Sequence, residues 1–170
     1  MKKRKTQLII IASIFHALLL VTVYVFQGAI LPYLRLNGLV PLLLPIVSTG
    51  VAITQGRVAG GVSGLVAGIL CDISFNEPVG MFMIILTLAG LLVGFLADLV
   101  LTRGFVSYFC CCAAVLSFAA IAQLFPLLLF VGIPPGPLFS TALWQTLYSL
   151  AFAFPIWFFV RSPNLMMPEI

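Results

Sequence analysis

The side chains that could perform acid–base, nucleophilic or metal chemistry in this sequence are few and widely separated. They are the carboxylates Asp72, Glu77, Asp98 and Glu169, the single histidine His16, and the cysteines Cys71, Cys110, Cys111 and Cys112. No two carboxylates have the spacing that paired acid–base catalysis needs, and three adjacent cysteines on a helix point in three directions. We therefore expect no enzymatic activity, no metal site and no cofactor, and we interpret the cysteines as small packing residues.

Glycines at a regular spacing of four residues lead up to Asp72. On a helix, Gly68 and Asp72 each lie within about 20° of Gly61, and Gly64 lies about 60° from Gly61. Because small residues allow two helix backbones to approach closely in lipid, we expect this face to pack against another helix, from this chain or from a partner. The candidates for helix packing or partner contact are Gly56, Gly60, Gly61, Gly64, Gly68, Gly90 and Gly94.

The position of Asp72 leaves three roles open. The 16 residues from Arg57 to Asp72 cover about 24 Å of helix, against about 30 Å of hydrocarbon, so Asp72 lies just inside the outer boundary. It could cap the positive N-terminus of the next helix, bind a cation or a basic group of a partner, or exchange protons. Pro78 suits the first turn of that next helix. We therefore group four residues as an outer hairpin motif, namely Asp72, Ser74, Pro78 and Gly80.

Two further polar side chains share one face of the first apolar run. His16 and Gln27 are eleven residues apart, so they differ by about 20° around a helix. A proton relay, a contact with a partner and ordinary hydrogen bonding between helices are all compatible with this arrangement. Gln123 and Gln145, in later apolar runs, have the same alternatives.

The composition is that of an integral membrane protein. Of 170 residues, 63% are hydrophobic and 7% are charged, and the long apolar runs predict membrane helices rather than barrel strands. Glycine, asparagine and proline at turn positions separate six such runs. We predict one all-α membrane domain over residues 1–170, with spans at 8–31, 39–54, 57–75, 78–101, 105–132 and 138–160.

The basic residues indicate the orientation of these spans. If the N-terminus is cytoplasmic, seven lysine and arginine residues lie at cytoplasmic ends and only Arg35 lies outside. The seven are Lys2, Lys3, Arg4, Lys5, Arg57, Arg103 and Arg161. We predict that both termini are cytoplasmic, and we interpret the positive charge as an orientation signal rather than as a surface for nucleic acid.

The segment GLVAGILCDISFNEPVG, residues 64–80, resembles the central motif of the rod shape-determining protein MreD family. In that motif a glycine-rich helix ends in glycine, two hydrophobic residues, any residue and aspartate, followed by serine and a Pro-x-Gly entry to the next helix. The corresponding residues here are Gly68, Ile69, Leu70, Cys71, Asp72, Ser74, Pro78 and Gly80. The chain length, the six spans and the basic N-terminus are also similar to this family.

The resemblance implies a non-catalytic scaffold subunit of the cell-elongation machinery in the bacterial plasma membrane. Its expected partners are an MreC-like protein and, through it, the actin-like MreB and a peptidoglycan synthase pair. It also implies a compact six-helix bundle similar to the substrate-binding subunits of energy-coupling-factor vitamin transporters. That relationship supplies the alternative function, a vitamin-binding subunit with a polar pocket formed by Asp72, Asn76, Glu77, Trp144 and Gln145.

Overall fold

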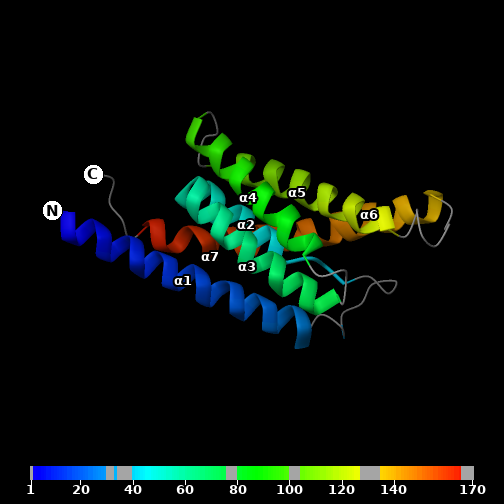
Figure 1. The fold of residues 1–170 in the computed structure, drawn as a ribbon, viewed down its shortest axis with the longest axis horizontal. Helices are drawn as coiled ribbons and strands as arrows, with labels where there is room; N and C mark the ends of the chain where they lie inside the picture. The colour runs from blue at the N-terminus through cyan, green and yellow to red at the C-terminus, as the bar shows by residue number, and fades with distance from the viewer. Residues whose placement is uncertain are drawn as a thin grey trace.

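The chain forms a bundle of helices, as the composition predicts. The computed structural model describes residues 2–29, 33, 40–75, 80–99, 104–126 and 135–165, and no strand occurs within these ranges. The helices are α1 (Lys2–Ala29), α2 (Leu44–Gln55), α3 (Arg57–Phe75), α4 (Met81–Leu99), α5 (Phe105–Pro126), α6 (Pro135–Ala151) and α7 (Ala153–Leu165). Helix α1 lies along one side, α4 and α5 lie on the other, and α2 lies between them (Figure 1). The beginning of α1 and the end of α7 are at the same end of the bundle (Figure 1).

Several of these helices are long and apolar enough to cross a membrane. Four qualify individually, namely Ile11–Ala29, Arg57–Ser74, Met81–Leu99 and Phe105–Ala122. The bent pair formed by α6 and α7 supplies a fifth if it is counted as one span. The described residues therefore have the helices of a multi-pass membrane protein. The remaining predicted span, the second at 39–54, corresponds to α2, which has only 12 residues.

Helix α2 begins at Leu44 rather than at residue 39, and residues 40–43 are not helical. A helix from residue 39 would need Pro45 to donate a hydrogen bond to the carbonyl of Pro41, but proline has no N–H. In the first turn of α2 that missing donor costs nothing, because the N–H groups there have no partner within the helix. Every residue from Leu44 to Thr54 is buried, so α2 is enclosed by the other helices.

The last predicted span is broken rather than continuous. Residues Phe139–Ala151 and Ala153–Arg161 are inclined at 44° to each other. The cause is Pro155, which cannot donate to the carbonyl of Ala151 and whose ring pushes against the preceding turn. At the break, the N–H of Phe152 donates to the carbonyl of Ser149 over 3.0 Å.

Other boundaries also differ from the predicted ones. Helix α1 begins at Lys2 instead of residue 8, and α4 begins at Met81 instead of residue 78, after Gly80 with a φ of 101°. Helix α5 is described as far as Pro126, and α7 continues to Leu165. Residues 30–31, 39, 78–79, 100–101 and 127–132 of the predicted spans lie outside the described residues.

Candidate functional site

Helices α3 and α4 form an antiparallel hairpin in which backbone lies directly on backbone. A Cβ atom on Gly64 would overlap the carbonyl of Leu86, and one on Gly90 would overlap the carbonyl of Gly60. The equivalent overlaps at the other positions are Gly60 with the Gly90 oxygen, Gly68 with the Phe82 oxygen and the Met83 backbone, and Gly94 with the Arg57 backbone. Glycine is therefore required at these positions for the two helices to approach this closely.

The remaining glycines of this set are also in contact within the chain. A Cβ on Gly60 would lie 2.6 Å from the Cβ of Ala52, so α3 also packs on α2. Gly61 faces the side chain of Leu91, and Gly56 faces the carboxylate of Asp98. Of the two alternatives that the sequence leaves open for these glycines, the structure shows helix packing within the chain. The glycine face is filled by α2 and α4.

Asp72 closes the end of this hairpin at which α3 ends and α4 begins. Its side chain is only 8% exposed, and its two oxygens accept hydrogen bonds from three backbone N–H groups at the start of α4. These donors are Gly80 at 3.0 Å, Phe82 at 2.9 Å and Met83 at 3.2 Å. Among the three roles that the sequence allows, this is the geometry of a helix cap supplied by the neighbouring helix. All described donors around the carboxylate belong to the backbone.

The other three residues of the outer hairpin motif differ in what the structure describes. The hydroxyl of Ser74 donates to the carbonyl of Leu70 in its own helix over 2.8 Å, and Ser74 is exposed. Pro78 lies outside the described residues, together with Asn76 and Glu77. Gly80 supplies both a donor to Asp72 and the positive φ that precedes α4.

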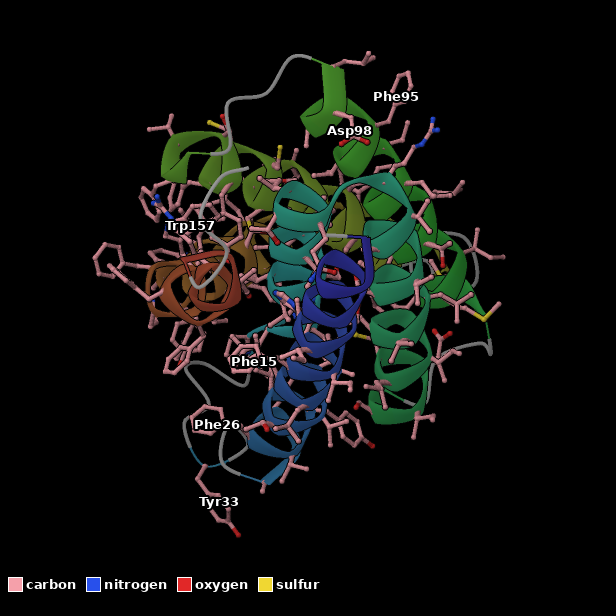
Figure 2. The ribbon with its side chains drawn as sticks, turned by 90° about the vertical axis from the view of Figure 1, so that its left-hand side faces the viewer. Phe15, Phe26, Tyr33, Phe95, Asp98 and Trp157 are labelled. Carbon is pink, nitrogen blue, oxygen red and sulfur yellow. The ribbon has the colours of Figure 1, made fainter. Side chains whose placement is uncertain are left out.

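Asp98 is the counterpart of Asp72 at the opposite end of the hairpin. It lies in the last turn of α4, and its Oδ2 atom is 3.5 Å from the N–H of Arg57, the first residue of α3. Figure 2 shows Asp98 beside the turn between α2 and α3, whereas Phe95 points away from the bundle. Each helix of the pair therefore places a carboxylate at the N-terminus of the other, where the helix dipole favours negative charge.

The sequence contains a pattern that identifies Asp98 as a second candidate cap. Gly90, Gly94 and Asp98 repeat the four-residue spacing of Gly64, Gly68 and Asp72. In an antiparallel pair, identical spacings on both helices place the aspartates at opposite ends. The repeated pattern thus predicts two caps, one at each end.

A second group of polar side chains holds the start of α2. The Oε1 atom of Gln27, on α1, accepts from the N–H groups of Leu43 and Leu44 at 3.0 and 3.4 Å. The hydroxyl of Ser149, on α6, accepts from Leu42 N–H at 2.9 Å, and Gln145 donates to the carbonyl of Val40 over 3.2 Å. These bonds satisfy backbone groups that would otherwise be unpaired inside the membrane.

The polar contacts predicted for His16, Gln27 and Gln123 have different outcomes. His16 does not join the group around Gln27, because its ring contacts Val160 on α7 and Gln55 on α2. Among the described residues, the buried Nε2 atom of Gln27 has no hydrogen-bond partner. The side chain of Gln123 lies outside the described residues.

We predict that Ser149→Ala destabilises the protein while Ser74→Ala does not. Removing the Ser149 hydroxyl leaves the buried N–H of Leu42 without its acceptor, which should lower the free energy of unfolding by about 1–3 kcal/mol. The exposed Ser74 hydroxyl bonds only within its own helix, so its loss should change that energy by less than about 0.5 kcal/mol. Unfolding in detergent measures both. Equal effects would mean that Leu42 finds another acceptor.

The contacts described above hold the helices of the bundle together. Carboxylate, amide and hydroxyl groups are directed at backbone N–H groups of neighbouring helices, and glycines allow close approach. Among the described residues, no three His, Cys, Asp or Glu side chains are grouped so that they could hold a metal ion. No protein-family model matches the chain, and searches of curated proteins and of solved structures returned no match.

Proposed function

We propose that this protein is a non-catalytic membrane scaffold of the bacterial cell-elongation complex, which supports peptidoglycan synthesis and rod shape. It would lie in the plasma membrane with six crossings and both termini in the cytoplasm. Its partners would be an MreC-like protein and, through it, MreB and a peptidoglycan synthase pair. This function is the one implied by the resemblance of residues 64–80 to the MreD motif.

The observation that supports the proposal is that the motif residues hold α3 and α4 together. Gly64 and Gly68 allow α3 to contact α4, and Asp72 closes the outer end of the pair through three backbone hydrogen bonds. The motif thus builds a stiff platform, which is the property that a scaffold requires. A ligand-binding role for Asp72 would compete with these bonds.

The arrangement of the shorter helices supports six crossings. Helix α2 together with residues 40–43 provides one passage within the bundle, and the bent pair α6 and α7 provides another. Non-helical backbone is tolerated at membrane depth when it is buried in protein, as residues 41–43 are. The start of α1 and the end of α7 lie at the same end of the bundle, which agrees with two cytoplasmic termini (Figure 1).

Depletion of the protein in its own host tests the proposal. We expect rod-shaped cells to widen and become round, and an affinity-tagged copy in mild detergent to recover the MreC-like protein and the synthase pair. The tagged copy must restore rod shape, which controls for damage by the tag. Unchanged cell shape together with no recovery of these partners would contradict the proposal.

One observation favours the vitamin-binding alternative, namely the buried Nε2 atom of Gln27, which can donate hydrogen bonds but has no acceptor within the described part of the chain. Gln27 is not one of the residues predicted for that pocket, and the three of those that the structure describes are engaged separately. Asp72 caps α4, Gln145 bonds to Val40, and Trp144 is 62% exposed. Recovery of an ATPase with its membrane coupling subunit, or a vitamin that raises the unfolding temperature, would favour the alternative.

A further inference from the structure

Helix α1 contacts the rest of the bundle along one narrow stripe. It lies along one side of the molecule (Figure 1), and between Ile11 and Ala29 four of its side chains are buried. These four, whose exposed fractions lie between 2% and 4%, are Ala12, His16, Leu20 and Gln27. The flanks of the stripe are mostly apolar and exposed, so lipid already covers them and α1 loses few contacts when it moves.

The second half of α1 is held on α2 by one amide group. The Oε1 atom of Gln27 accepts hydrogen bonds from the N–H groups of Leu43 and Leu44, at 3.0 and 3.4 Å. The Nε2 atom of the same amide has no acceptor among the described residues. An unpaired buried donor costs about as much free energy as two ordinary hydrogen bonds contribute. Gln27 therefore attaches α1 to α2 only weakly.

Helix α6 holds the preceding residues of the same segment more firmly. The N–H group of Leu42 donates to the hydroxyl of Ser149 over 2.9 Å, and that hydroxyl donates to the carbonyl of Gln145 over 2.7 Å. The side chain of Gln145 also donates to the carbonyl of Val40. The Ser149 hydroxyl thus both accepts and donates, whereas the amide of Gln27 only accepts. Successive residues of one segment are held with different strength by α6 and by α1.

The first half of α1 is the better attached one. His16 contacts both Val160 on α7 and Gln55 on α2, so this half has polar contacts with two helices. Between Leu20 and Gln27 no side chain of α1 is buried. The weakly held part of α1 therefore extends from about Leu20 to its end.

We propose that this second half of α1 is a movable strap over the start of α2, which opens when Gln27 separates from Leu43 and Leu44. Gln27 lies in the last turn of the candidate span Ile11–Ala29, close to the membrane surface. Water there supplies the acceptor for Nε2 that the closed arrangement lacks. Opening uncovers the start of α2, which is otherwise enclosed by the bundle, while residues 40–42 stay on α6. The strap is independent of the proposed scaffold function.

Hydrogen exchange of the unmodified protein in lipid nanodiscs tests the strap, with Leu42 as the internal control. We expect the N–H groups of Leu43 and Leu44 to exchange with D₂O at one common rate, because one opening exposes both. That rate should be at least about tenfold faster than the rate for Leu42, whose acceptor is on α6. Exchange at Leu43 and Leu44 that is no faster than at Leu42 would overturn the proposal.

Distances between spin labels test whether α1 itself moves. One label is attached through Val25→Cys on α1 and the other through Ile73→Cys on α3, and both positions are exposed. We expect Gln27→Leu to add a longer distance between these labels, because it removes the acceptor that holds the strap. Ser149→Ala removes the corresponding acceptor on α6, so it should leave the distance unchanged.

A second pair of labels, at Ile14 and Val58, reports on the first half of α1 and should keep one distance in every variant. Both positions are exposed, and Cys110 and Cys111 are replaced by alanine so that they take up no label. If Gln27→Leu changes neither pair, only the amide rotates away and there is no strap. If it lengthens both pairs equally, α1 dissociates as a whole, which also contradicts the proposal.

Discussion

Replacing Gly64 with alanine is expected to lower the free energy of unfolding by at least about 3 kcal/mol, the upper end of what overpacking costs. The added Cβ would overlap the carbonyl of Leu86 and lie 3.2 Å from the Cα of Thr87. Both are backbone atoms, which cannot rotate away as a side chain can. Gly64→Leu should prevent the folded protein from accumulating in the membrane, which detergent extraction and size-exclusion chromatography would show.

Gly28 offers the matched control for this substitution. It lies on α1, its φ is not in the left-handed region, and a Cβ there would meet no atom of the described residues within 4 Å. Gly28→Leu should therefore leave the unfolding transition of the detergent-solubilised protein within about 0.5 kcal/mol of the wild type. If Gly64→Leu and Gly28→Leu were equally stable, α3 and α4 would not be in backbone contact.

The second large effect is expected at Asp72. Asp72→Ala leaves three backbone N–H groups at the start of α4 without an acceptor, and bonds to a charged group contribute about 1.5–3 kcal/mol each. Because the three losses are not additive, we expect a total of about 3–4 kcal/mol. The loss for Asp72→Asn should lie between zero and the loss for Asp72→Ala, because the remaining amide oxygen still accepts while the NH₂ group opposes the other donors. Unfolding in mixed micelles measures all three proteins.

Asp98→Ala is the natural comparison, because Asp98 performs the equivalent task at the other end. Its contact with Arg57 N–H is long, at 3.5 Å, and its side chain is exposed. We therefore expect a loss of less than about 1 kcal/mol, the value typical of an exposed charge at a helix terminus. A greater loss for Asp98→Ala than for Asp72→Ala would show that burial does not decide the strength of these caps.

The sequence predicts the hairpin well because its signals are local. Glycines four residues apart on two neighbouring helices can meet only if the turn between them brings the helices together, and Asp72 is eight residues from its first donor. Close spacing along the chain restricts the geometry strongly. The same restriction makes the repeated pattern ending in Asp98 interpretable.

The supports of α2 could not be predicted, because they join distant parts of the chain. Ser149 is 107 residues from Leu42, and Gln145 is 105 residues from Val40. No pattern of hydropathy specifies such a pair, since many helix arrangements bury the same residues. The shortness of α2 and the bend before Ala153 are different, because Pro45 and Pro155 are local signals in the sequence for each of them.

Closure of the hairpin at both ends also bears on how the chain is inserted during synthesis. A carboxylate in an isolated apolar helix resists transfer from the translocon to lipid, by up to about 3 kcal/mol at the bilayer centre. The backbone N–H groups that bond to Asp72 are synthesised only 8 to 11 residues later, whereas the N–H group that faces Asp98 is synthesised 41 residues earlier. The transfer of α3 to lipid is therefore more favourable once the start of α4 is present to bond to Asp72. The two should leave the translocon together, as one preassembled pair.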